Sequence, residues 1–261
     1  MTFEEILASV SNNEVTLPAE WAQGRATFGG LVGALAYERM QDVVTPGRPM
    51  RAMQVSFVGP VEPGLPVSLE AELLREGKSA SQAMVRMVQD GSTRAVALGS
   101  FGGGRDSSVT VSPLDAPDAP PPEDCTPTPY IEGLMPSFTQ FIEMRWCYGG
   151  LPFSGKGGRE MGGWMKFREP PAELGDAGVI NLIDAWPPAL LSHLKDRVPS
   201  SSLSWSVELV HPRPEVRPDE WLLYKATIDQ AGEGYGHIHA EIWNRKGELV
   251  AISRQTVVVF G

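Results

Sequence analysis

The sequence contains little cysteine and little positive charge. Cys125 and Cys147 are its two cysteines, too few for a disulfide framework and, without further ligands, for a zinc site. We therefore expect both to be free thiols in a reducing compartment. The 22 Lys and Arg residues are outnumbered by 32 Asp and Glu residues and are scattered along the chain. This argues against a nucleic-acid partner, because such a partner requires a concentrated cationic surface.

Long apolar runs are also absent. The longest, Leu31 to Tyr37, is far shorter than the ~18 residues that would indicate a membrane span, so we expect none and a soluble protein. The first residues are acidic where a signal peptide is basic, and Thr2 with Glu5 has the pattern of a capping box that opens a short helix. We expect the protein to stay in the cytoplasm.

Several catalytic motifs are missing. There is no Gly-x-Ser-x-Gly elbow and no histidine near either cysteine in the sequence, so a covalent nucleophile is not indicated. His237-Ile238-His239 lacks the further ligands of a metal site and is expected to be a surface pair. Gly155-Lys156-Gly157-Gly158 lacks the spacing of a phosphate-binding loop. We predict no metal site and no cofactor.

A proline-rich segment divides the chain. Seven prolines fall between Pro113 and Pro129, where neither helix nor sheet can continue. We predict an N-terminal domain over residues 1–110, a linker over 111–130 and a C-terminal domain over 131–261.

The two sides of the linker have similar patterns. Each has an apolar helix followed by four strands, with a two-residue hairpin signal before the last strand. The predicted elements on the first side are a helix over Leu31–Tyr37 and strands over Met53–Val58, Val67–Leu74, Ala80–Gln89 and Thr93–Phe101. Those on the second side are a helix over Ala185–Leu194 and strands over Leu203–Val210, Trp221–Asp229, Tyr235–Trp243 and Leu249–Phe260.

Turn residues on the two sides recur at a nearly constant offset of 155 or 156 residues. The matched pairs are Pro63 with Pro218, Gly77 with Gly232, and Gly91 with Gly247. They favour a duplicated α+β unit, in which two tandem antiparallel sheets each wrap around a long apolar helix. The alternative is a pair of unrelated α+β lobes.

Four motifs carry a resemblance to a known family. They are Phe28-Gly29-Gly30, Gly162-Gly163-Trp164, Asp184-Ala185-Trp186-Pro187-Pro188 and Gln255. In order and spacing, from about Trp21 to Phe260, the chain resembles the type II acyl-CoA thioesterases and their thioesterase-like relatives. The resemblance implies a double hotdog fold.

The resemblance also implies a function and a site. The family hydrolyses fatty acyl-CoA to free acid and CoA, and holds a water with an aspartate, a threonine and a glutamine. These roles fall on Asp184, Ser202 and Gln255, with serine in place of threonine. Backbone N–H groups of Gly29 and Gly30, or of the turn at Asp184, would bind the oxyanion. The implied partner is an acyl-CoA, in fatty acid metabolism; self-association of the chain is left open.

On its own, Asp184 has two interpretations. It is an acid in an apolar segment, where an unpaired carboxylate is costly, and aspartate is also a common helix N-cap. The 155-residue offset places it opposite Gly29, so the first half makes the same turn without an acid. We therefore expect a catalytic role and one site per chain.

The other two residues are less clear from pattern alone. Gln255 shares a strand face with apolar residues, so it either orients a water beside Asp184 or makes a structural hydrogen bond. Ser202 alternates with the apolar positions of its strand, and it would face the core only if a bulge turned it round. Ser200 and Ser201 are the alternatives.

Two rival functions remain. One is a hotdog hydratase or dehydratase, which would pair an acid with a histidine; the next histidine after Asp184 is His193. The other is a family member that binds an acyl thioester or a protein partner without hydrolysis, which the absent threonine makes relevant.

Overall fold

The computed structural model of the chain describes residues 1–10 and 12–260. The short helix α1 (Phe3–Ala8) opens with the predicted capping box, in which Thr2 accepts from the N–H of Glu5 and Glu5 accepts from the N–H of Thr2. Among the described residues, no helix has the length and apolar character needed to cross a membrane.

The N-terminal half follows the predicted order, and the apolar run becomes the buried helix α2 (Gly29–Gln41). Asp90 and Gly91 both have positive φ, as a tight two-residue hairpin requires. The strands are β1 (Glu14–Thr16), β2 (Ala22–Gln23), β3 (Ala26–Thr27), β4 (Met50–Phe57), β5 (Pro66–Glu76), β6 (Ala80–Gln89) and β7 (Ser92–Gly102), with the short 3₁₀ helix η1 (Ala19–Trp21).

The C-terminal half contains the four predicted strands and others that the sequence did not reveal. Its helical elements are α3 (Gly175–Ile183), η2 (Pro122–Asp124), η3 (Ser137–Phe141) and η4 (Ala189–His193). Its strands are β8 (Thr126–Pro127), β9 (Ile142–Tyr148), β10 (Glu160–Phe167), β11 (Ser200–Leu209), β12 (Leu222–Gly232), β13 (Tyr235–Trp243) and β14 (Leu249–Val259).

The predicted long helix over Ala185–Leu194 is wrong. The α-helix of this half is α3, which ends at Ile183, and Asp184 is its C-terminal cap residue. Pro187 and Pro188 explain the difference, because proline lacks an N–H and clashes with the preceding turn, so the helix cannot continue through them. Within the predicted range, the structure has the 3₁₀ helix η4.

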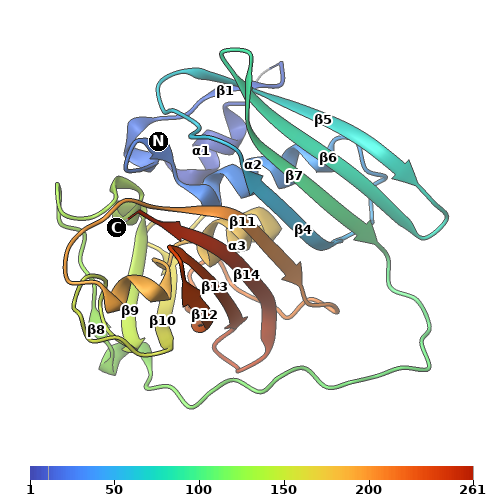
Figure 1. The fold of residues 1–261 in the computed structure, drawn as a ribbon. Helices are drawn as coiled ribbons and strands as arrows, with labels where there is room; N and C mark the ends of the chain where they lie inside the picture. The colour runs from blue at the N-terminus through green and yellow to red at the C-terminus, as the bar shows by residue number, and fades with distance from the viewer. Residues whose placement is uncertain (11, 261) are drawn as a thin grey trace.

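Two separate sheets were predicted, but the structure has one large antiparallel sheet of twelve strands, in the order β1-β5-β6-β7-β4-β11-β14-β13-β12-β10-β9-β8. The halves join where β4 pairs with β11, for example Val55 with Trp205. Figure 1 shows the two groups of strands meeting at β4 and β11, beside α2 and α3. The duplication is visible in the order itself, since β1-β5-β6-β7-β4 is mirrored by β10-β12-β13-β14-β11.

Helices α2 and α3 pack against each other through glycine. A Cβ on Gly30 would lie 2.5 Å from the carbonyl oxygen of Asn181, and one on Gly33 would lie 3.2 Å from the side chain of Ile180. These contacts place the N-terminus of α2 beside the C-terminus of α3. At the other end of the pair, Tyr37 donates to Asp176 at 3.3 Å.

The linker packs against the C-terminal half of the chain. It runs from the end of β7 along the C-terminal half to β8 (Figure 1). The indole of Trp243 donates to the carbonyl of Leu114, Tyr148 donates to that of Asp118, and Trp164 donates to that of Pro120. The linker thereby covers a second, smaller apolar cluster that includes Leu223 and Leu249.

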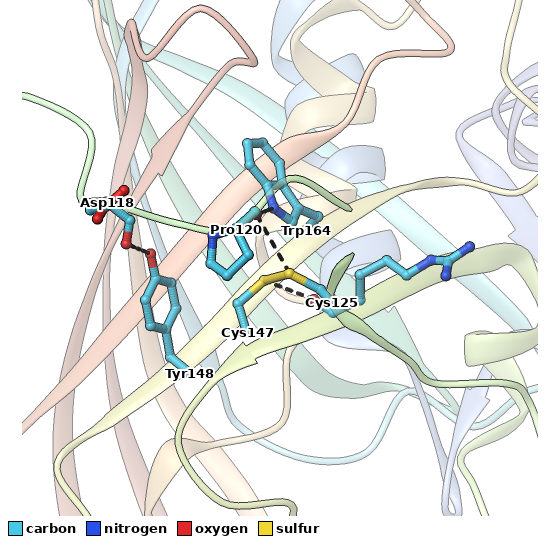
Figure 2. Close-up of a disulfide and its surroundings, with 7 residues drawn as sticks. Asp118, Pro120, Cys125, Cys147, Tyr148 and Trp164 are labelled. Carbon is cyan, nitrogen blue, oxygen red and sulfur yellow. Dashed lines mark hydrogen bonds between the residues drawn. A yellow bond between two sulfur atoms is a disulfide. The ribbon is translucent and has the colours of Figure 1, made fainter. Parts of the chain in front are cut away.

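The prediction of free thiols is wrong. Cys125, at the end of the linker, forms a disulfide with Cys147 in β9, and their Cα atoms are 5.4 Å apart (Figure 2). Figure 2 also shows the hydrogen bonds of Trp164 and Tyr148 to the linker beside this bond. Sequence spacing could not reveal the pairing, because it depends on how the linker lies across the sheet.

Candidate active site

Asp184 lies where the two helices meet and is held by two hydrogen bonds. Gln255, in β14, donates from its amide nitrogen to Asp184 Oδ1 at 2.5 Å, and the backbone N–H of Gly30 donates to the same carboxylate. Both Asp184 and Gln255 are half-buried. The structure therefore brings together two of the three residues predicted to hold a water, although 71 residues separate them.

The environment of Asp184 favours proton exchange near neutral pH. Burial raises its pKa from 3.8 to about 7, while the hydrogen bonds from Gln255 and Gly30 act in the opposite direction. The α3 C-terminus is the negative end of a helix dipole and the α2 N-terminus is the positive end of another. A carboxylate in this setting can accept a proton at physiological pH.

Gly29 and Gly30, predicted as oxyanion or substrate-binding residues, form the first turn of α2 directly against Asp184. A Cβ on Gly29 would lie 2.6 Å from Asp184 Oδ2 and 3.1 Å from the ring of Phe57. No larger residue fits without moving the carboxylate. The interpretation of Gly29 as the counterpart of Asp184 in the repeat is wrong, because Gly29 begins α2 whereas Asp184 follows the end of α3, which begins at Gly175.

Asp184 is also not a helix N-cap. It follows the last turn of α3, where an acid opposes the helix dipole and is less stable than a neutral residue. The structural alternative considered for this residue thus does not apply.

Ser202 faces the core side because of a bulge. The register between β11 and β14 shifts between Ser202 and Ser204, so that Ser202 pairs with Val257 while Trp205 pairs with Gln255. Opposed residues of an antiparallel pair point to the same face, and Val257 and Trp205 are fully buried. Ser202 therefore lies on the face of Gln255, but among the described residues its hydroxyl makes no hydrogen bond to Asp184 or Gln255.

Two further side chains near Asp184 were not predicted. Tyr224 is buried in β12, and burial together with the charge of Asp184 raises its pKa. Asn181 is fully buried one turn before Asp184, and among the described residues neither atom of its amide has a partner. The only sequence signal for Asn181 was its position as an amide within the apolar run before Asp184.

The first half has a counterpart of this site, and it is filled with apolar side chains. The register irregularity of β11 recurs in β4, between Met50 and Ala52, which matches Met50 with Ser202. Three residues further along β4, Met53 pairs with Gly99 of β7, as Trp205 of β11 pairs with Gln255 of β14. Gly99 is therefore the counterpart of Gln255.

The counterpart of Asp184 follows from contact. A Cβ on Gly99 would clash with the sulfur of Met40, so Met40 of α2 lies over Gly99 as Asp184 of α3 lies over Gln255. Met40 and Met50 are fully buried. Asp42 caps α2 as Asp184 caps α3, but Asp42 is exposed and paired with Arg39. Among the described residues, the first half therefore has no buried acid over the counterpart of Gln255.

The family of the chain follows from its match to family models. A model described as the acyl-CoA thioesterase N-terminal domain matches residues 17–102, and one described as the acyl-CoA thioesterase C-terminal domain matches residues 122–259. The chain belongs to the acyl-CoA thioesterase family. The predicted family resemblance is confirmed, and comparison with curated proteins finds no match.

Solved structures share the fold of this acyl-CoA thioesterase family member. A hotdog protein of unknown function from Alicyclobacillus acidocaldarius is 23% identical, with a TM-score of 0.83 over 99% of this chain and 98% of that chain. The acyl-CoA thioesterase II TesB2 from Mycobacterium marinum is also 23% identical, with a TM-score of 0.79 over the same shares. The hotdog fold is confirmed.

The structure explains one of the motifs by which the family was recognised. Gly162 and Gly163 lie in β10 at a shift in its register with β9. A Cβ at Gly162 would clash with the carbonyl oxygen of Tyr224, and one at Gly163 would clash with that of Arg145. In this thioesterase family member, glycine therefore lets β10 pair closely with both β9 and β12, where Gly163 is opposite Tyr224.

Proposed function

We propose that the protein is an acyl-CoA thioesterase that hydrolyses a fatty acyl thioester of CoA with a water held by Asp184. The observation that carries the proposal is the hydrogen-bonded pair of Asp184 and Gln255 at the junction of α2 and α3. Family membership supports thioester hydrolysis in general. The acyl-CoA substrate and the roles of the residues are part of the proposal.

In the proposed reaction, Asp184 acts as the general base. Its carboxylate takes a proton from a water as the water oxygen attacks the thioester carbonyl carbon. Gln255 fixes the carboxylate, and the hydroxyl of Ser202, on the same face of the sheet, helps to orient the water. The carbonyl oxygen becomes an oxyanion.

The oxyanion would be stabilised at the start of α2. The first N–H groups of a helix have no partner inside it and carry the positive end of its dipole. Gly30 already donates to Asp184, so Gly29 is the nearer candidate for the oxyanion, and a second donation by Gly30 remains part of the proposal. When the intermediate collapses, the carbon–sulfur bond breaks and the CoA thiolate takes the proton from Asp184. The products are a free acid and CoA.

The test is thiol release from short, medium, long and aromatic acyl-CoA substrates, measured with a thiol reagent. We expect turnover of at least one substrate without added metal, and the same rate with EDTA. The absence of turnover across the whole panel would contradict the proposal and favour a member that binds without hydrolysis.

The hydratase alternative has less support in the geometry. His193 is exposed on η4, and its Nε2 lies 2.8 Å from the carbonyl oxygen of Gly158. Among the described residues, His193 has no hydrogen bond to Asp184. Incubation of an enoyl-CoA with the protein should therefore give no hydroxyacyl-CoA.

A cytoplasmic location and a role in fatty acid metabolism remain proposals. The disulfide between Cys125 and Cys147 argues against a cytoplasmic location, because structural disulfides are rare in the reducing cytosol.

A further inference from the structure

A groove of about 480 Å³ lies at the end of the C-terminal part of the sheet. One wall comes from η4 and the residue after it, and the other from the ends of β12, β13 and β14. Its lining is mostly apolar and includes Leu190, Leu194, Ile228 and Val259. A groove of this kind can accept an organic ligand of moderate size.

The groove lies close to Asp184 along the fold. Val259, in its wall, shares a strand face with Val257 and Gln255, and four residues of β14 span about 13 Å. Leu190 packs directly on the backbone of Gly236, which pairs with Val257. Val257, between the groove and Gln255, is fully buried beside Leu190, so a ligand in the groove reaches Gln255 and Asp184 only if Leu190 moves aside.

Basic side chains gather around the groove. Arg159 and His193 line it. Lys156 and Lys195 lie on two segments that bond to each other, through Gly155 N–H to the carbonyl of Leu194 and Gly157 N–H to that of Ser192. The guanidinium of Arg197 lies over the ring of Phe153, in the same loop.

These cations are not neutralised by acidic partners. Among the described residues, Lys156, Arg159, Lys195 and Arg197 form no ion pair. The nearest acids in sequence are Asp196 and Glu160, and Glu160 is already paired with Lys225 at 2.8 Å. Arg159 and Arg197 donate to backbone carbonyls, of Ile228 and Leu134 among others, and no acid pairs with them. In a chain with a net charge of −10, four cations without an acidic partner in and beside one apolar groove form a local site for an anion.

We propose that this groove binds the CoA part of the substrate, with the phosphates held by Lys156, Lys195 and their two arginine neighbours and the pantetheine arm lying on the apolar floor toward Gln255. This rests on the proposed thioesterase function. An acyl chain alone would need the apolar floor but not the cations, whereas CoA is polyanionic at one end and carries its thioester at the other. Lysines serve as point charges for phosphate, which needs no fixed geometry.

The experiment measures CoA binding apart from turnover. Free CoA is titrated calorimetrically into the wild type and into the double variant Lys156→Glu/Lys195→Glu. Both lysines are exposed, so folding should be unaffected. We expect the Kd for CoA to rise by about tenfold or more, with a lower salt dependence. The matched control is Arg75→Glu/Lys78→Glu, two exposed cations of the N-terminal half, which should bind CoA as the wild type does.

Kinetics extend the test. The lysine variant should raise KM for acyl-CoA while leaving kcat within about twofold, and it should hydrolyse an acyl N-acetylcysteamine thioester, which has no phosphate, as the wild type does. Ala231→Trp, an exposed groove position, should also weaken CoA binding.

Different failures are distinguishable. Unchanged CoA affinity in the lysine variant would overturn the groove proposal, as would a shift in acyl-chain preference without loss of CoA affinity in Ala231→Trp. CoA binding that depends on the lysines, in a protein that hydrolyses no thioester, would contradict only the proposed function.

Discussion

At the scale of the residue, the site depends on a carboxylate confined between two helix ends. Asp184 has the C-terminus of α3 behind it and the first turn of α2 in front, and burial outweighs its two hydrogen bonds in setting the pKa. Ionisation of such a group opposes folding, so its contribution to stability is lost as the pH rises from 3.8, its ordinary pKa, to about 7, its pKa in the folded protein.

Gly29→Ala tests whether the close contact between Gly29 and the carboxylate of Asp184 matters for catalysis. The new Cβ would lie 2.6 Å from Asp184 Oδ2, so the carboxylate must move away from it. Moving the catalytic carboxylate should lower kcat by about 10- to 100-fold. Thermal melting should change little, because alanine is a good helix former. Gly103→Ala, where nothing lies within 4 Å of the added Cβ, is the control. A wild-type kcat in Gly29→Ala would show that the contact does not matter.

At the scale of the element, the bulge in β11 decides which serine can serve. Ser202 lies on the core side because Leu203 is the extra residue, whereas Ser204 pairs with Thr256 and lies on the opposite face from Trp205. Strand alternation without the bulge would have placed Ser202 on the outer face.

Ser202→Ala should therefore lower kcat by about tenfold or more, since it removes the hydroxyl proposed to orient the water, and Ser202→Thr should keep or raise it. Thiol release from the best acyl-CoA provides the measurement, with Ser204→Ala as the control. If Ser202→Ala has full activity, the assignment fails, and Ser200, which pairs with Val259 on the same face, is the next residue to replace.

Strand patterns predicted much of the fold, and the failures have specific causes. The strands β5 to β7 and β11 to β14 fall near their predicted ranges because each alternates or follows a clear turn. β10 was missed because Gly162 and Gly163 interrupt it, and glycine in a strand normally weakens that signal. The pair Asp184–Gln255 came from the family resemblance, because no local pattern links residues so far apart.

At the scale of the whole molecule, the two similar halves differ at the positions of the site. Met40, Met50 and Gly99 occupy the positions that correspond to Asp184, Ser202 and Gln255. Calorimetric titration with a non-hydrolysable acyl-CoA thioether should therefore give one ligand per chain. This number does not depend on whether the two domains begin and end at the predicted residues 110 and 131. Two equivalent ligands per chain would contradict the counterpart assignment.

The disulfide bonds the end of the linker to strand β9 of the C-terminal half. Cys125 and Cys147 are 22 residues apart, and a cross-link of this span stabilises by about 3 kcal/mol in the chain-entropy account. Cys125→Ser/Cys147→Ser should therefore melt several degrees lower than the wild type under oxidising conditions. Thiol titration of the unfolded, unreduced protein should find no free thiol, whereas two free thiols would show that the bond is absent.

The pH dependence of thiol release by the wild type and Asp184→Asn tests the central claim most directly. The base must be ionised to act, so wild-type kcat should rise with pH through a midpoint near 7, the raised pKa of Asp184. Asp184→Asn should lose about 10²- to 10⁴-fold in kcat and should lose that rise. It should melt no lower than the wild type at pH 8, since it removes a buried charge. The account would be contradicted if Asp184→Asn kept the wild-type kcat, or if its kcat still rose with pH through a midpoint near 7.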